Sequence, residues 1–130
     1  MNYNLEVGLK NENEKVVKEN MLASKYGSGE VDVLATPVMI GLIEEAALKA
    51  VDSKLPEGYA TVGYDLNVKH LAPTPLGMRV RAEARLEKIE DRKLNYSVKV
   101  YDEKELVGKG THIRYIVNTK KLKEKAEAKK

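Results

Sequence analysis

The stretch from Ala35 to Val51, ATPVMIGLIEEAALKAV, limits the possible folds of this chain more than any other segment. Thr36-Pro37 is typical of a helix start, because a threonine hydroxyl can cap free backbone amides and proline suits the first helical position. We expect the helix to run from about Pro37 to Asp52, before SKLPEGY ends it. Its residues are apolar on almost every side, so other elements must cover most of its surface.

The remaining chain alternates apolar and polar residues, a pattern that predicts half-buried antiparallel strands. One strand is expected in the first nine residues, MNYNLEVGL, followed by a polar turn at the start of KNENEKVVKEN. The residues expected to share one face of each later strand are Val62, Tyr64, Leu66, Val68 and His70; Val80, Ala82, Ala84 and Leu86; and Leu94, Tyr96, Val98 and Val100. A last strand is expected from Leu106 to Val117.

One strand, one long apolar helix and four further strands predict an α+β domain. Because the helix must be covered on most sides, we expect a curved antiparallel sheet of about five strands to wrap around it, which is the hotdog fold. With 130 residues, the chain is expected to form one domain, residues 1–119, followed by a lysine-rich C-terminal tail, residues 120–130.

The net charge of +3 does not indicate nucleic-acid binding, because it is concentrated near the C-terminus. Residues 118–130 contain six lysines and two glutamates, a balance of +4, which leaves −1 for the other residues. A nucleic-acid site needs a basic face on the folded domain. The chain also has no cysteine and no apolar run long enough to span a membrane. We therefore expect a cytoplasmic protein that binds neither nucleic acid nor membrane and holds no metal.

The two adjacent glutamates of the helix have different surroundings at about 100° per residue. Glu45 has Lys49 four residues on, a favourable pair, so Glu45 is expected to face water. Glu44 is expected to face the protein or a pocket, where an ionised carboxylate is costly without partners. Its neighbours on the helix surface are Ile40, Gly41, Ala47, Leu48 and Val51. Such a glutamate serves acid–base catalysis, faces a partner subunit, or bonds the backbone structurally.

Two further side chains are candidates for chemistry. His70 ends its predicted strand beside the segment LAPTPLG, and histidine is the side chain whose unperturbed pKa lies nearest to neutral pH. An inward histidine is, however, also common in protein cores. Thr36 is fully explained as a helix cap, and it also lies where helix N-terminal amides stabilise anionic oxygen. The pattern leaves the placement of His112 open, and spacing alone does not bring Thr36, Glu44 and His70 together.

Three segments carry a family resemblance: LATPVMIGLIEEAALKAV, VGYDLNVKHLAPTPLGMRVRAEARLEKIEDRKL and LVGKGTHIRYIV. Together they resemble the fluoroacetyl-CoA thioesterase-like family of hotdog proteins, from about Val7 to Lys120. The most specific parts are A-T-x-x-M-x-G-L-x-E at the helix start and H-x-A-x-T-P-x-G after the second strand.

The resemblance implies that Thr36, Glu44 and His70 are the catalytic set of a thioester hydrolase, with no cofactor beyond the coenzyme A of the substrate. It also implies substrate contacts for Gly63 and Arg114, and support of the site or of a subunit interface by the segment GTHIR. The active site is implied to lie at the interface of a homodimer or a larger oligomer.

The loop YGSGEVDVL before the helix is small and acidic, and the chain has no phenylalanine. The fluoroacetyl-specific enzyme of the family relies on phenylalanines in this region. We therefore expect an acyl-CoA thioesterase for short acyl groups in general. The alternatives are a non-catalytic acyl-CoA-binding or sensing protein and a hotdog hydratase or dehydratase, because a fold does not fix a function.

Overall fold

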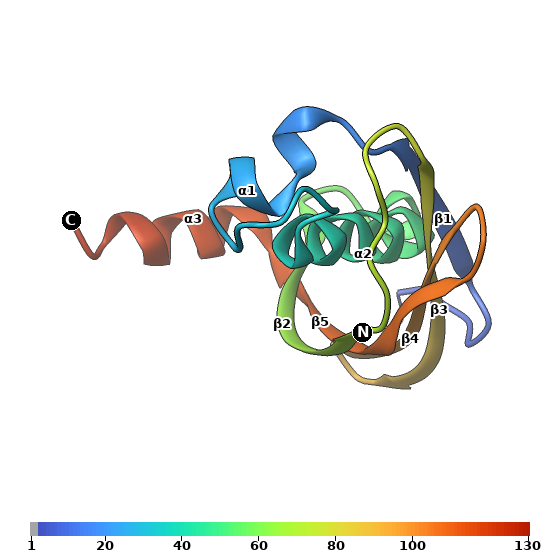
Figure 1. Ribbon diagram of the computed structural model, residues 1–130. Helices are drawn as coiled ribbons and strands as arrows, with labels where there is room; N and C mark the ends of the chain where they lie inside the picture. The colour runs from blue at the N-terminus through green and yellow to red at the C-terminus, as the bar shows by residue number, and fades with distance from the viewer. Residues whose placement is uncertain (1–2) are drawn as a thin grey trace.

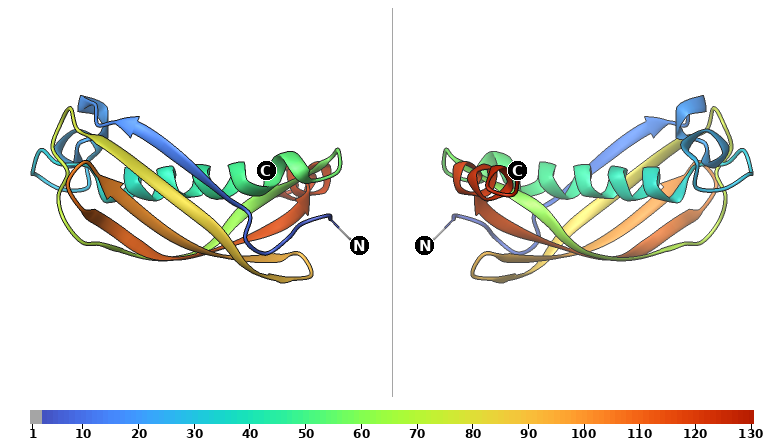
Figure 2. Two further views of the ribbon diagram at one scale, coloured as in Figure 1. Left: turned by 90° about the vertical axis from the view of Figure 1, so that its right-hand side faces the viewer. Right: turned by 90° about the vertical axis from the view of Figure 1, so that its left-hand side faces the viewer.

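The computed structural model describes residues 3–130, and its central element is helix α2 (Thr36–Val51). The helix lies along the concave side of a single curled sheet, which passes beneath it from end to end (Figures 1 and 2). The expected helix and the expected wrapping of a sheet around it are both confirmed.

Five antiparallel strands form the sheet. They are β1 (Lys10–Val16), β2 (Tyr59–His70), β3 (Arg79–Glu90), β4 (Lys93–Asp102) and β5 (Leu106–Asn118). Their order is β1-β3-β4-β5-β2, so β1 and β2 are the two edges. Short turns join β3, β4 and β5 as consecutive neighbours, as the sequence pattern predicts. This arrangement is the α+β hotdog architecture.

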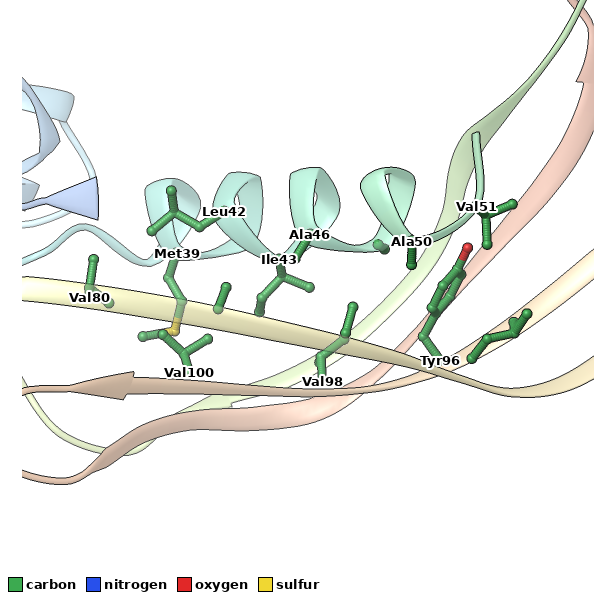
Figure 3. Close-up of a cluster of buried hydrophobic side chains, with 14 of the residues drawn as sticks. Met39, Leu42, Ile43, Ala46, Ala50, Val51, Val80, Tyr96, Val98 and Val100 are labelled. Atoms are coloured by element: carbon green, nitrogen blue, oxygen red, sulfur yellow. The ribbon is translucent and has the colours of Figure 1, made fainter. Parts of the chain in front are cut away.

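The core lies between α2 and the concave face of the sheet (Figure 3). Met39, Ile43 and Ala46 of the helix are fully buried and face residues of β4 such as Val98. Burial of each large apolar side chain stabilises the fold by roughly 1.5–3 kcal/mol. The predicted inward residues of β3 and β4 are all buried: Val80, Ala82, Ala84, Leu86, Leu94, Tyr96, Val98 and Val100.

The first strand lies later in the chain than the pattern predicts. Residues 3–9 form no strand, and β1 is made from the polar segment KNENEKV that was expected to begin with a turn. Residues 1–2 of the expected strand lie outside the described residues. Only Asn13 of β1 is buried, and its side-chain amide donates to the Glu45 carboxylate of α2 at 2.7 Å. Because the other side chains of this edge strand are exposed, β1 needs no apolar alternation, which is why periodicity missed it.

Strand β2 contains a bulge at Tyr64. Gly63 and Asp65 pair with successive residues of β5, so Tyr64 between them has no partner in the ladder. The extra residue shifts the alternation by one position. Tyr64 is therefore 68% exposed, whereas Thr61 before the bulge is buried and Leu66 after it packs against the core. The expectation of one shared face for Val62, Tyr64, Leu66, Val68 and His70 is wrong for the first two residues.

The remaining elements lie at the two ends of α2. Two short helices, η1 (Glu19–Met21) and α1 (Ala23–Tyr26), lie near its start, and η2 (Asp52–Lys54) follows its last residue. Helix α3 (Thr119–Glu127) lies at the end of the molecule where α2 stops (Figure 2). Among residues 3–130, no helix is both long and apolar enough to cross a membrane.

Two glycines of β5 test how closely the strands pack. At Gly110 an added Cβ would overlap the backbone carbonyl of Asn67 in β2, whereas at Gly108 it would meet the flexible end of the Met39 side chain at 2.8 Å. We expect Gly110→Ala to lower the free energy of unfolding by about 3 kcal/mol and Gly108→Ala by about 1 kcal/mol, since backbone yields less readily than a thioether. Urea denaturation measures both values. Equal losses would contradict the argument.

Candidate active site

Thr36 does not cap α2, contrary to the sequence prediction. The cap position is Ala35, whose backbone is extended and whose side chain makes no capping bond. The Thr36 hydroxyl instead lies 2.8 Å from Nδ1 of His70, at the end of β2. A backbone hydrogen bond from Leu34 to Thr74 holds the chain before α2 against the chain after β2. The hydroxyl and the imidazole are therefore held together by two separate segments.

The imidazole of His70 is half-buried at the rim of the sheet. Burial lowers the pKa of His70, and the backbone of Ala72 partly opposes this effect. The Nε2 atom is enclosed and makes no hydrogen bond to any residue in the range 3–130. A neutral ring is thus favoured at pH 7, and the tautomer with its proton on Nε2 leaves Nδ1 free to accept the Thr36 hydroxyl proton.

The Thr36–His70 pair lies in an open groove of about 360 Å³. Its walls include Ala23, Ser28, Val33, Leu34, Leu71 and Pro73. The backbone N–H groups of Thr36 and Val38 have no hydrogen-bond partner among the described residues, and Pro37 has no N–H to donate. A hydroxyl beside an imidazole can attack a carbonyl carbon, and free amides at a helix N-terminus can stabilise the oxyanion that results.

Glu44 lies two helical turns beyond Thr36, about 12 Å along the axis of α2 at 1.5 Å per residue. Its side chain is 40% exposed, and its carboxylate lies 3.7 Å from the guanidinium of Arg114. The carboxylate also lies over Gly63, where an added Cβ would approach its oxygen to 2.7 Å. Gly63 therefore leaves room for this carboxylate, and a contact of Gly63 with substrate stays a prediction.

Arg114 is buried behind Glu44 in a polar network. Its guanidinium donates to the Thr61 hydroxyl at 2.8 Å, to the Thr61 carbonyl at 2.9 Å and to Nε2 of His112 at 3.2 Å. The Thr61 hydroxyl in turn donates to Asp52 at 2.6 Å. A buried guanidinium needs such partners and nearby carboxylates to offset its desolvation. In this chain Arg114 orients Glu44, and a direct contact with substrate stays a prediction.

His112 is the residue of this site whose role the sequence pattern left open. It is only 1% exposed, and its Nδ1 donates to the Asp65 carbonyl at 2.8 Å. Nε2 is then the acceptor for Arg114, so both ring nitrogens are occupied. Burial and the charge of Arg114 lower the pKa of His112. His112 therefore positions the network as a neutral ring. Its position two residues before Arg114, on the same strand face, was the available signal.

The neighbouring Glu45 has the structural role that the helical spacing predicts. It forms an ion pair with Lys49 at 3.2 Å and is 39% exposed. Burial alone would raise the pKa of Glu45, but hydrogen bonds from Lys49 and Asn13 outweigh it and lower the pKa. Glu45 thus ties α2 to β1.

Within one chain the predicted residues form two groups. Thr36 and His70 make one group, and Glu44, Gly63 and Arg114 make the other. Glu44 forms no hydrogen bond or ion pair with Thr36 or His70 of its own chain. Across residues 3–130, no cluster of three or more His, Cys, Asp or Glu side chains could hold a metal ion.

Comparison with known proteins identifies the family. Residues 17–120 match the family model described as fluoroacetyl-CoA-specific thioesterase. The chain belongs to this family. A curated relative, the fluoroacetyl-CoA thioesterase of Streptantibioticus cattleyicolor, is 35% identical over 98 residues, which cover 75% of this chain and 70% of the relative. The resemblance found in the sequence is thus confirmed.

Solved structures of the thioesterase family and of a hotdog relative share the fold. The structure of the fluoroacetyl-CoA thioesterase FlK is 30% identical, covers 97% of this chain and 98% of its own, and superposes with a TM-score of 0.90. A hot-dog-like protein from Thermanaerovibrio acidaminovorans is 25% identical, covers 99% of this chain and 97% of its own, and has a TM-score of 0.89. An FlK variant solved with fluoroacetate and CoA has a TM-score of 0.85, at 30% identity, with 91% of this chain and 99% of that chain covered.

The two histidines predict how the stability of this family member depends on pH. The fold lowers the pKa of both His70 and His112, so the unfolded chain binds more protons below about pH 6.5. Their contribution is fully present above that pH and is lost as the pH falls towards the folded-state values. We expect the free energy of unfolding to fall between pH 6.5 and 5, by at most about 1.4 kcal/mol per pH unit for each histidine.

Urea denaturation at pH 5, 6 and 7 measures this slope. Because the chain has only two histidines, His70→Gln should make the slope shallower without removing the part that His112 contributes. An unchanged slope in this variant would show that His70 is not responsible.

Proposed function

We propose that this protein is an acyl-CoA thioesterase that hydrolyses the thioester of short acyl-CoA molecules at a Thr/Glu/His site on a dimer interface. The observation that carries the proposal is the 2.8 Å contact between the Thr36 hydroxyl and Nδ1 of His70, at a helix N-terminus and in an open groove. Membership of a thioesterase family supports the same reaction.

In the proposed reaction, Thr36 Oγ1 attacks the thioester carbonyl carbon while Nδ1 of His70 takes the hydroxyl proton. The free N–H groups at the start of α2 stabilise the oxyanion of the tetrahedral intermediate. The carbon–sulfur bond then breaks, and the coenzyme A sulfur leaves with the proton from His70. A water molecule, deprotonated by His70 or by a nearby carboxylate, hydrolyses the Thr36 ester and restores the enzyme. These steps need no cofactor.

In this proposal the nearby carboxylate is that of Glu44 from a second copy of the chain. Strand β2 is an edge strand whose outer backbone groups have no partner strand among residues 3–130. An unpaired edge is a ready template for another strand, and two identical strands pair antiparallel about a two-fold axis. We infer that the β2 strands of two protomers pair in this way and join the two sheets.

Matching inward-facing residues limits the register to those with the two-fold axis at a residue of β2, and we choose the axis at Asn67 because it brings Gly63 opposite the partner's His70. An axis at Asn67 places Leu66 opposite the partner's Val68, and residues directly opposite one another point to the same face. Because Tyr64 is the extra residue of the bulge, the next inward pair joins Gly63 to the partner's His70. A shift by one residue would set inward side chains against outward ones.

This register joins the two halves of the site. Glu44 lies over Gly63, so its carboxylate would lie beside the Thr36–His70 pair of the partner. Opposed Cα atoms in antiparallel strands are about 5 Å apart, which is within reach of a glutamate side chain. The half-exposed Glu44 would thereby become enclosed, with Arg114 behind it to balance its charge.

The rival functions separate in one assay. Incubation with acetyl-, butyryl- and crotonyl-CoA should release free thiol. With crotonyl-CoA, the enoyl absorbance should not change before thiol appears. A binding or sensing protein would bind these ligands without thiol release, and a hydratase would change the enoyl absorbance alone.

We expect Thr36→Ala, His70→Ala and Glu44→Gln each to lower kcat by roughly a hundredfold to ten-thousandfold, because each removes a group that handles a proton or the acyl carbon. Circular dichroism and gel filtration should show a wild-type fold and dimer. Near-normal hydrolysis in any one purified variant would remove that residue from the mechanism.

A mixing experiment tests the shared site. Neither His70→Ala nor Glu44→Ala homodimers should be active, but refolding them together should restore about one quarter of the wild-type activity, since half of the dimers are mixed and each contains one intact site. If Glu44 served His70 of its own chain, every mixed site would lack one group and no activity would return. A mixture of Thr36→Ala and His70→Ala is the matched control, because both residues belong to the same half-site and no activity should return.

A further inference from the structure

A second groove lies at the opposite end of β2 from His70. It has a volume of about 300 Å³ and is formed where α3 crosses the start of β2 and the turn after β3. Its walls are Tyr3, Tyr59, Arg92, Val117, Lys121 and Lys125, together with Asn118 and Leu122. Three of these residues are cations and none is a carboxylate. None of the three cations forms an ion pair with any residue in the range 3–130.

The start of α3, the helix that carries Lys121 and Lys125, is held in position by hydrogen bonds. The Asn118 side chain caps α3 by accepting from the backbone of Lys121 at 3.0 Å. The backbone of Thr119 donates to the Gly58 carbonyl at 3.0 Å, which fixes the start of α3 to the turn before β2. Lys121 and Lys125 are four residues apart, so they project from the same side of the helix.

Two aromatic rings also line the groove. Tyr3 and Tyr59 lie with their ring centroids 6.1 Å apart, tilted by 60°. Cations recognise phosphate groups through charge-assisted hydrogen bonds, and aromatic rings offer stacking surfaces to a base. Three unpaired cations around two tyrosines therefore match a small phosphorylated nucleotide, in which negative charge and a flat ring occur together.

The position of the groove fits one end of the proposed substrate. Within one chain, Tyr59 lies eleven residues from His70, about 36 Å along an extended strand, which is longer than a pantetheine arm. In the proposed dimer, Gly63 is opposite the partner's His70, and Tyr59 is only four residues from Gly63, about 13 Å. The groove of one protomer would thus lie beside the Thr36–His70 groove of the other.

We propose that the groove of Arg92, Lys121 and Lys125 binds the phosphorylated adenosine end of the acyl-CoA whose thioester occupies the partner's Thr36–His70 groove. This inference rests on the proposed function and assigns the nucleotide end of its substrate to α3. Lys121 and Lys125 then bind substrate as well as contributing to the net charge.

The test separates the nucleotide from the thioester. We expect Lys121→Ala/Lys125→Ala to raise KM for acetyl-CoA about tenfold with kcat unchanged, since two charge-assisted contacts to phosphate are lost. The kcat/KM for S-acetylpantetheine, which has no nucleotide, should not change. Isothermal titration calorimetry with adenosine 3′,5′-bisphosphate should show binding to the wild type that weakens about tenfold in the variant and in high salt.

The matched control is Lys120→Ala/Lys123→Ala, which removes the same charge from α3 outside the groove and should leave all these values near wild type. Equal effects of the two double variants, or equal effects on acetyl-CoA and S-acetylpantetheine, would overturn the nucleotide assignment. The assignment would also be overturned if Lys121→Ala/Lys125→Ala lost binding to anionic phosphatidylglycerol vesicles but kept its binding to the nucleotide. If the wild type hydrolyses both substrates but binds no bisphosphate, this inference fails while the proposed function stands; if it hydrolyses neither, the proposed function fails.

Discussion

The packing of one nearly apolar helix against one curled sheet determines the rest of this structure. Helix α2 buries Met39, Ile43 and three alanines against the concave face, so its axis is fixed over the strands. Once the axis is fixed, the start of the helix lies beside the end of β2, and Thr36 meets His70. The same packing leaves one stripe of the helix uncovered, and Glu44 lies on that stripe. The core therefore positions both halves of the candidate site.

The two adjacent glutamates of α2 differ in the side chains that contact their carboxylates. Glu45 has a lysine and an asparagine as partners and serves to connect α2 with β1. Glu44 has a buried arginine that Thr61 and His112 hold in place, so its position is defined while its oxygens stay partly accessible. In the proposed function, a carboxylate that is oriented yet accessible suits proton transfer better than one whose oxygens are all paired. Two adjacent glutamates thus have different surroundings because their neighbours differ.

Sequence reasoning predicts the parts that depend on strong periodicity. The bounds of α2, the inward faces of β3 and β4 and the hotdog architecture follow from apolar spacing. It fails where other rules decide: β1 is a polar edge strand, and the bulge at Tyr64 reverses the alternation within β2. Spacing predicts a capping role for Thr36, because it does not show that a histidine thirty-four residues away contacts the Thr36 hydroxyl. The two separate half-sites are likewise invisible to spacing, since three-dimensional proximity depends on strand register.

The two edges of the sheet differ in chemistry, and this difference controls how large an assembly can become. Strand β1 has lysine and glutamate side chains along nearly its whole length, and ion pairs such as Arg81–Glu12 cover its junction with β3. A charged border of this kind resists the addition of another strand. Most of strand β2 lacks charged side chains of this kind. In the proposed dimer the two β2 edges pair with each other and the charged β1 edges resist further addition, so this chemistry favours a finite particle over a fibre.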